Sequence, residues 1–205
     1  MKILHILPSL ITGGGEKFTV DLCNELSINN EVVLCLLYKP TEEMFLKRLV
    51  SNRVKVIALN KKKGIDLSLI SALKHVIKDE SPDVINTHLR ALVYSWVGKV
   101  FSRKASFHTI HNVAEKESGS LIRKLYFLLF NIFRIHPISI SSRVLSSVKS
   151  CYGLRHEVCV ENGVKSPETT SSLCDVQSEV EGYRITEKTK VFLNIGRLCD
   201  QKNQI

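Results

Sequence analysis

The sequence predicts an α/β fold in which a parallel, Rossmann-like sheet carries helices on both faces. Short apolar runs alternate with longer amphipathic segments through residues 1–165, the order expected of repeated strand–helix–strand units. The 205 residues are 44% hydrophobic and 24% charged, a composition typical of a globular chain. No apolar stretch reaches the ~20 residues that a membrane-spanning helix requires. The pattern therefore favours a globular sheet-and-helix protein over a fibrous, disordered or membrane-spanning one.

The expected strands are short apolar runs that end at turn-forming residues. Several lack polar alternation, as strands buried on both faces do. Pro82-Asp83 breaks the chain before the fourth strand, and Asn162-Gly163 forms a turn after the seventh. In chain order the strands are Lys2–Leu7, Glu31–Tyr38, Val54–Leu59, Val84–Thr87, Ser106–Ile110, Pro137–Ser141, Glu157–Glu161 and Lys190–Ile195.

The expected helices carry apolar side chains on one side at helical spacing. Phe18, Leu22 and Leu26 form such a stripe in the first helix, and Thr41 and Asp66 are suitable N-caps for the second and third. In chain order the helices are Glu16–Ile28, Glu42–Val50, Leu67–Lys78, Ala91–Phe101, Leu121–Phe133 and Ser142–Tyr152.

The composition changes after residue 165. Lys165–Tyr183 is rich in Ser, Thr and Glu and shows no clear periodicity, which indicates a linker. One strand and a polar turn follow, and a single strand cannot bury both of its faces. We therefore expect a domain over 1–165, a linker over 166–188, and the truncated start of a second domain over 189–205.

The net charge of +9 is unevenly distributed. Residues 1–165 contain 24 Lys and Arg against 14 Asp and Glu, whereas residues 166–205 contain 5 against 6. A basic first domain suggests an anionic partner, namely a phosphorylated substrate, an acidic membrane or a nucleic acid. The alternative is lysines that are simply solvated on helix surfaces. Basic residues are not interleaved with aromatic ones, so we expect no nucleic acid.

The cysteines and the first residues indicate a cytoplasmic protein. None of the six cysteines is paired in a CxxC motif, and no His/Cys cluster accompanies them, so we expect free thiols and no metal. The opening run MKILHILPSLI contains Pro8 and is followed by glycines rather than by a signal-peptidase site, so it is interpreted as a first strand.

Polar residues follow the carboxyl ends of five expected strands, where open α/β sheets bind ligands. Without side chains, Gly13–Gly15 lets backbone N–H groups at a helix start approach a phosphate or a sugar hydroxyl. The alternative is a merely tight turn. The loop is neither a G-x-G-x-x-G fingerprint, because Phe18 stands at the last glycine position, nor a Walker A loop. The other residues at this edge are His88 with Arg90, His111 with Asn112, Asn162-Gly163, and Arg197 with Lys202.

Two of these groups have a chemistry that suits the edge. His111, in a polar loop, can donate to a hydroxyl or share a proton near neutral pH, and His88 has the same placement; the alternative for both is a structural histidine. Arg197 and Lys202 suit a diphosphate leaving group, unless the loop is simply solvated. His108 lies inside a strand and is expected in the core.

Six segments, in order, resemble GT-B glycosyltransferases of the family-4 type. The resemblance is carried by ILHILPSLITGGGEKFTVDLCNEL, SPDVINTHL, FHTIHNV, PISISSRVLSSVKSCYGL, VENGV and VFLNIGRLCDQKNQ. It implies the N-terminal half of a GT-B fold and retaining transfer of a sugar from a nucleotide-sugar donor, without a metal. The acceptor implied is a glycan or a lipid-linked glycan, as in synthesis of bacterial-type surface polysaccharides.

The resemblance also implies roles for particular residues. Gly14 and Gly15 would contact donor phosphate or acceptor, and His111 would lie beside the transferred sugar as the catalytic residue. Arg197 and Lys202 would hold the departing diphosphate, and His88, Arg90 and Asn112 would lie on the acceptor side. Lys165 and Pro137 depart from the acidic residues usual at these places in the family.

Two further expectations concern the whole chain. Most of the nucleotide pocket in this family belongs to the second domain, so we expect these 205 residues alone to be inactive. The alternatives are a non-catalytic or partner-dependent module that binds sugar or phosphate, and a nicotinamide-dependent oxidoreductase or epimerase. Ser120–Ile135 is apolar on most faces and has cations near its ends, which suggests a helix on the inner face of the membrane, or else a buried one.

Overall fold

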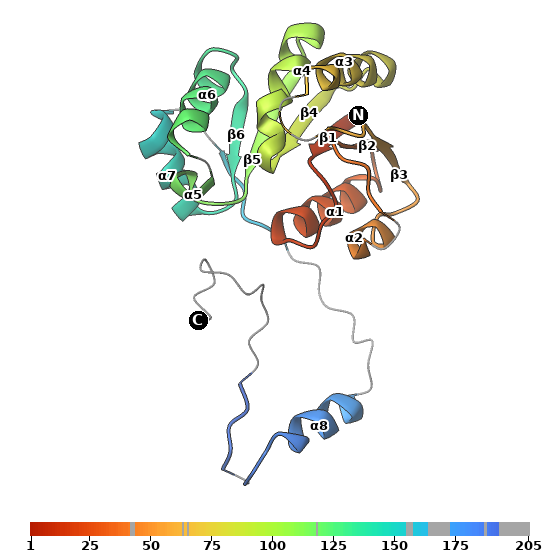
Figure 1. Cartoon of the computed structure of the whole chain (residues 1–205), viewed down its shortest axis with the longest axis vertical. Helices are drawn as coiled ribbons and strands as arrows, with labels where there is room; N and C mark the ends of the chain where they lie inside the picture. Colours follow the sequence, from red (N-terminus) through yellow and green to blue (C-terminus); the bar gives the residue numbers. More distant parts are fainter. Residues whose placement is uncertain are drawn as a thin grey trace. The chain divides into compact units, whose positions relative to one another are not determined.

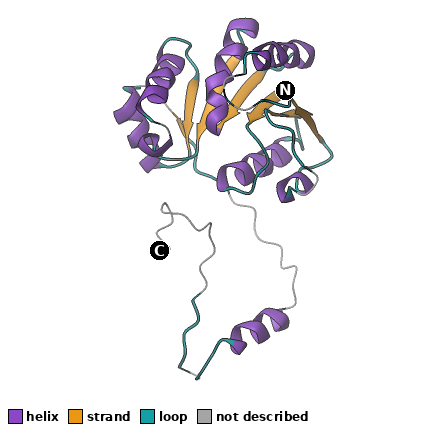
Figure 2. Cartoon of the chain, in the orientation of Figure 1, coloured by secondary structure: helices purple, strands orange, loops and turns teal. Residues whose placement is uncertain are grey.

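The computed structural model describes residues 1–41, 44–62, 64, 66–117, 119–154, 158–163, 173–186 and 188–192. The chain divides into two compact units, Met1–Val164 and Lys165–Ile205. The first unit contains a seven-stranded parallel sheet in the order β3-β2-β1-β4-β5-β6-β7 (Figures 1 and 2). Its strands are β1 (Lys2–Leu7), β2 (Glu31–Leu36), β3 (Val54–Ala58), β4 (Val84–His88), β5 (Ala105–Ile110), β6 (His136–Ser139) and β7 (Val158–Cys159).

Helices connect these strands and cover the sheet on both faces. They are α1 (Gly14–Leu26), α2 (Phe45–Arg48), α3 (Ser68–Glu80), the 3₁₀ helix η1 (Leu89–Tyr94), α4 (Ser95–Ser102), α5 (Ala114–Glu117), α6 (Ser120–Asn131) and α7 (Ser142–Tyr152). The expected α/β class, with helices on both faces, is confirmed.

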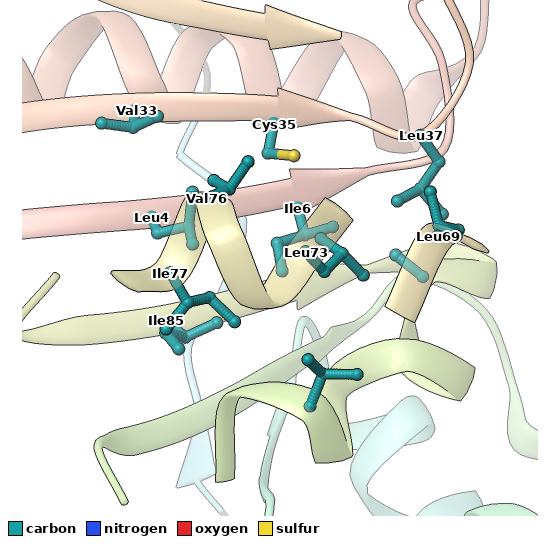
Figure 3. Close-up of a cluster of buried hydrophobic side chains, with 12 residues drawn as sticks. Leu4, Ile6, Val33, Cys35, Leu37, Leu69, Leu73, Val76, Ile77 and Ile85 are labelled. Atoms are coloured by element: carbon teal, nitrogen blue, oxygen red, sulfur yellow. The ribbon is translucent and has the colours of Figure 1, made fainter. Parts of the chain in front are cut away.

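Strand order and side-chain alternation assign the helices to faces. Val20 and Cys23 of α1 pack with Leu34 of β2 on one face, which α2 also covers. Leu73 of α3 packs with Ile6 of β1 on the opposite face, together with α4 (Figure 3). The chain moves in one direction across the sheet from β1 to β3 and in the other from β4 to β7, so right-handed crossovers place the two groups of helices on opposite faces.

A second cluster continues the α3–α4 face over β5 and β6. Tyr126 and Phe130 of α6 and Val148 of α7 pack with Ile110 at the end of β5. The register pairs Ile85 of β4 with Ser106 of β5, which puts Ile85 and Ile110 on the same face of the sheet. Helices α6 and α7 therefore extend the layer that α3 and α4 begin.

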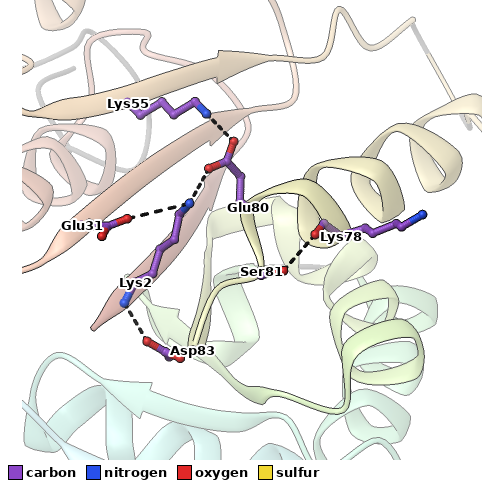
Figure 4. Close-up of polar contacts among 7 residues, drawn as sticks. All are labelled: Lys2, Glu31, Lys55, Lys78, Glu80, Ser81 and Asp83. Carbon is purple, nitrogen blue, oxygen red and sulfur yellow. Dashed lines mark hydrogen bonds and ion pairs between the residues drawn. The ribbon is translucent and has the colours of Figure 1, made fainter.

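A group of charges joins the amino ends of the strands to the end of α3 (Figure 4). Glu80 accepts from Lys2 Nζ at 2.8 Å and from Lys55 Nζ at 2.5 Å. The hydrogen bonds from these two lysines lower the pKa of the Glu80 carboxyl, although burial opposes the shift. The backbone N–H of Lys2 donates to Asp83 at 2.8 Å, so the same residue also connects β1 to the start of β4.

Most expected elements are present, with shifted ends. Helix α7 has the expected bounds. The N-cap positions of α2 and α3 are Met44 and Leu67 rather than the expected Thr41 and Asp66, although Asp66 still accepts from the backbone N–H of Ser68 at 3.1 Å. The expected helix Ala91–Phe101 is instead a 3₁₀ helix that continues into α4, and α5 is an additional element that the sequence does not predict. Of the expected strand Glu157–Glu161, only Val158–Cys159 is in a strand, and residue 157 lies outside the described part.

The second unit differs from expectation in two elements. Leu173–Gly182 forms helix α8, in a stretch for which the sequence shows no clear periodicity. Its described side chains are exposed, including Val176 and Val180. Lys190–Phe192 is not in a strand, and the rest of the expected strand lies outside the described residues. The expected domain boundaries stay a prediction.

Candidate functional site

The glycine loop and His111 lie side by side at the carboxyl edge of the sheet. Gly13 is the N-cap of α1, in the loop that connects β1 to α1, and His111 directly follows β5. A Cβ placed on Gly15 would lie 3.3 Å from Cγ of His111, 3.5 Å from its Nδ1 and 3.0 Å from a methyl of Leu89. A Cβ on Gly14 would meet nothing within 4 Å. Any larger residue at position 15 would therefore crowd the imidazole and Leu89.

Three imidazoles form a continuous hydrogen-bonded series, here named the histidine chain: His5, His88 and His111. The His5 Nδ1 and His88 Nε2 atoms are 3.0 Å apart, and the His88 Nδ1 and His111 Nε2 atoms are 3.2 Å apart. His5 and His88 are fully buried, whereas His111 is partly exposed. The histidine chain thus runs from the middle of β1 to the edge of the sheet.

The register of the sheet explains why these rings meet. His5 of β1 pairs with Asn86 of β4, and His88 is two residues further along β4. Residues two apart in a strand share a face, so His5 and His88 are diagonal neighbours on the face that α1 covers. Asn86 donates to Thr109 Oγ1 on the same face at 3.1 Å.

Burial keeps these imidazoles neutral near neutral pH. It lowers the pKa of His5 and of His111 to about 4 each, because the charged form loses its hydration. Burial, followed by the neighbouring imidazoles, holds the pKa of His88 well below its ordinary value. His111 can therefore donate one hydrogen bond and accept one, but it brings no positive charge to the site.

The other expected site residues are more dispersed. Arg90 is exposed in η1 after β4, and Asn112 Oδ1 accepts from the backbone N–H of Val113 at 2.9 Å. His88 is buried with both ring nitrogens engaged, so it reaches the edge of the sheet only through His111. Arg197 and Lys202 lie outside the described residues.

His108 lies in the core, as expected. Its side chain is fully buried in β5, on the face opposite the histidine chain, and its Nδ1 is 2.9 Å from Thr87 Oγ1. Burial lowers its pKa to about 3. Within the described part of the chain, no group of three or more His, Cys, Asp or Glu side chains is arranged to hold a metal ion.

Sequence reasoning misses the contribution of His5 and Phe18. In the sequence His5 is one residue of an apolar strand, although a single imidazole within an apolar run is itself a signal of a buried polar contact. Phe18, on α1, contacts the His111 ring edge-on with 5.5 Å between ring centres. Both contacts depend on elements far apart in the sequence, which no local pattern reveals.

Chemically, the edge offers N–H groups of a helix start beside a neutral imidazole. Helix starts carry unsatisfied N–H donors and partial positive charge, which favour an anion or a hydroxyl oxygen. His111 Nδ1 adds a hydrogen-bond donor or acceptor next to this helix start, because it lies 3.5 Å from the point that a Cβ on Gly15 would occupy. The arrangement suits a ligand that combines phosphate and sugar hydroxyls.

Comparisons with known proteins agree with this description. Two crystal structures of Anabaena Alr3699/HepE, one with UDP and one with UDP and glucose, match with TM-scores of 0.68 and 0.69 at 17% sequence identity. Each match covers 89% of this chain and 50% of that protein, so the chain spans about half the length of these structures. A search of curated protein sequences finds no match.

The expected GT-B resemblance is therefore confirmed at the level of fold, because the parallel sheet and its helices are those of the Rossmann-like N-terminal half of that fold. The family model described as Glycosyltransferase Family 4 matches residues 12–165, which include the glycine loop, His88 and His111. The chain belongs to Glycosyltransferase Family 4.

Proposed function

We propose that this chain forms the acceptor-side half of a retaining glycosyltransferase that moves a sugar from a nucleotide-sugar donor to a glycan or lipid-linked acceptor. The observation that carries the proposal is the close approach of Gly15 to His111 at the carboxyl edge of the sheet, where a Cβ on Gly15 would lie 3.3 Å from His111 Cγ. Family membership and the UDP and glucose bound by Anabaena HepE support a nucleotide-sugar donor.

The transfer breaks the bond between the sugar C1 and the donor diphosphate and forms a bond between C1 and an acceptor hydroxyl oxygen. The hydroxyl proton leaves with the diphosphate. Backbone N–H groups of Gly14 and Gly15 hydrogen-bond donor phosphate or acceptor oxygens, and neutral His111 hydrogen-bonds a hydroxyl of the transferred sugar to hold C1 in position. No residue in this scheme requires a metal.

The remaining roles are the ones that the resemblance to family-4 glycosyltransferases implies. We assign Arg90 and Asn112 to the acceptor side, with His88 acting there through His111. We assign Arg197 and Lys202 to the departing diphosphate, whose charge they neutralise. The chain alone does not turn over donor in this proposal, because the nucleotide contacts of the family come from a second domain.

Two measurements on the purified chain test this proposal. In amide NMR spectra, millimolar UDP-glucose is expected to shift the signals of Gly14, Gly15 and His111. His111→Ala weakens this response several-fold, whereas His75→Ala, at an exposed histidine of α3, leaves it unchanged. The absence of any shift at the glycine loop, or equal shifts with NADH, contradicts the proposal. Transfer of labelled sugar by the chain alone contradicts its expected inactivity.

The α6 surface supports an acceptor presented at a membrane. Leu121 is 80% exposed and Phe127 46%, and Arg123 and Lys124 lie beside them on the same helix. Arg123, Lys124 and Phe127 also line a cavity of about 480 Å³. No helix in the described residues is long and apolar enough to cross a bilayer. Apolar side chains next to cations match an anionic lipid surface, as in an interfacial helix.

We therefore propose that α6 holds the protein on the inner face of the membrane, where surface polysaccharides and their lipid-linked precursors are built. Vesicles containing anionic lipid are expected to bind the chain, and binding weakens as salt rises. Arg123→Ala with Lys124→Ala removes most of this binding, whereas Lys78→Ala, on α3, does not. Equal binding to neutral and anionic vesicles contradicts the electrostatic part of this proposal.

A further inference from the structure

The bonds within the histidine chain restrict where the three protons can lie. A neutral imidazole has one N–H and one bare nitrogen, so a nitrogen that donates leaves the other nitrogen of the same ring able only to accept. His88 is bonded on both sides, through Nε2 to His5 Nδ1 and through Nδ1 to His111 Nε2. All three rings are neutral near neutral pH because burial lowers their pKa values.

Only two arrangements satisfy both bonds. If His88 carries its proton on Nδ1, it donates to His111 and accepts from His5, and all three rings are protonated on Nδ1. If His88 carries its proton on Nε2, it donates to His5 and accepts from His111, and all three rings are protonated on Nε2. Any mixed arrangement brings two N–H groups or two lone pairs together at 3.0 or 3.2 Å in a buried setting, which is strongly disfavoured.

We propose that His5 and His88 are positioning residues that lock the tautomer of His111, so that the three rings share one tautomer and change it together. The hydrogen-bonding role of His111 Nδ1, beside Gly15, is then decided by two buried rings that touch no ligand. What the coupling serves rests on the proposed function: a sugar or phosphate oxygen that accepts from His111 Nδ1 requires all three rings in the Nδ1–H form.

His108 provides an internal contrast. It is as buried as His88, but it bonds to Thr87 Oγ1, and a hydroxyl can act as donor or acceptor. The tautomer of His108 is therefore independent of the histidine chain. His75, exposed on α3 with its Nδ1 2.7 Å from the carbonyl oxygen of Ser71, is a second reference outside the chain.

Long-range ¹H–¹⁵N NMR of the histidine-labelled, ligand-free chain at neutral pH tests the coupling, because protonated and bare ring nitrogens give distinct signals. The expected result is one shared tautomer for His5, His88 and His111. His88→Phe is expected to free His111, which then populates both tautomers. In His5→Phe, His88 and His111 are still expected to share one tautomer. His75→Phe is expected to leave the tautomers of all three rings of the histidine chain unchanged.

Two results would overturn the proposal: unlike tautomers among the three rings in the unaltered chain, or an unchanged His111 tautomer in His88→Phe. If His88→Phe does not fold, the tautomers of the three rings in the unaltered chain, alike or unlike, decide whether the proposal holds. The measurement needs no donor, so matched tautomers in a chain that ignores UDP-glucose would refute the proposed function and leave the coupling intact.

Discussion

Glu80 is the residue whose replacement most directly tests the packing of β1 against α3. Its carboxylate is 8% exposed and accepts from two lysines that come from different strands, Lys2 of β1 and Lys55 of β3. Glu31 reaches the same Lys2 ammonium at 3.9 Å, but its side chain is 79% exposed. Glu80→Gln and Glu31→Gln therefore each remove one carboxylate partner of Lys2, the first at a buried side chain and the second at an exposed one (Figure 4).

The exposure of each side chain sets how much unfolding free energy the two substitutions should remove. Hydrogen bonds to charged groups contribute about 1.5–3 kcal/mol when buried, whereas exposed ion pairs contribute about 0.2–1 kcal/mol. Lys55 is 61% exposed and Lys2 27% exposed, which reduces both contributions. We expect Glu80→Gln to lower the free energy of unfolding by about 1–2 kcal/mol and Glu31→Gln by less than about 0.5 kcal/mol.

Urea unfolding followed by circular dichroism measures both values. The pKa of Glu80 is lowered in the folded chain, so its contribution is present above the ordinary glutamate pKa of about 4.3 and is lost as pH falls through the lower folded value. The difference between Glu80→Gln and the unaltered chain should therefore be largest near neutral pH and shrink in acid. Equal effects of the two substitutions at pH 7 would refute the reasoning.

Three further substitutions probe the site and the core. Gly15→Ala crowds His111 and should weaken the response to UDP-glucose about threefold to tenfold by NMR titration, whereas Gly14→Ala, with open space around it, should not. Gly98→Ala would put a Cβ 2.6 Å from an isoleucine methyl of β4, so the unfolding free energy should fall by about 1–2 kcal/mol despite alanine's helix preference. The pKa of His108 is about 3 in the folded chain, below its unfolded value of about 6.5, so this residue lowers the free energy of unfolding as pH falls below about 6.5. His108→Phe should therefore reduce the change in unfolding free energy by about 1.4 kcal/mol per pH unit between pH 4 and 6. Equal responses of Gly14→Ala and Gly15→Ala would contradict the crowding argument, and a stabilised Gly98→Ala would contradict the packing argument. An unchanged pH dependence in His108→Phe would contradict the argument from the pKa of His108.

The sequence predicted the fold class and the edge at which the site lies. Apolar runs such as Lys2–Leu7 reveal strands because burial on both faces excludes polar side chains. Glycines after β1 and a histidine after β5 could be placed at one edge, because parallel strands all end there. Helix α8 was not predicted, because Leu173, Val176 and Val180 are only three apolar residues within a segment that is otherwise rich in Ser, Thr and Glu.

The local pattern of the chain thus predicted most of its elements, their order and the placement of Gly15 and His111 on a common edge. Only the tertiary structure decided that His5 belongs with them and that His88 faces inward between two other rings. The reason is the register of β1 against β4, which pairs residues about eighty positions apart. Apolar periodicity reports which face of a strand is buried, but which side chains meet across two strands depends on how far one is shifted along the other.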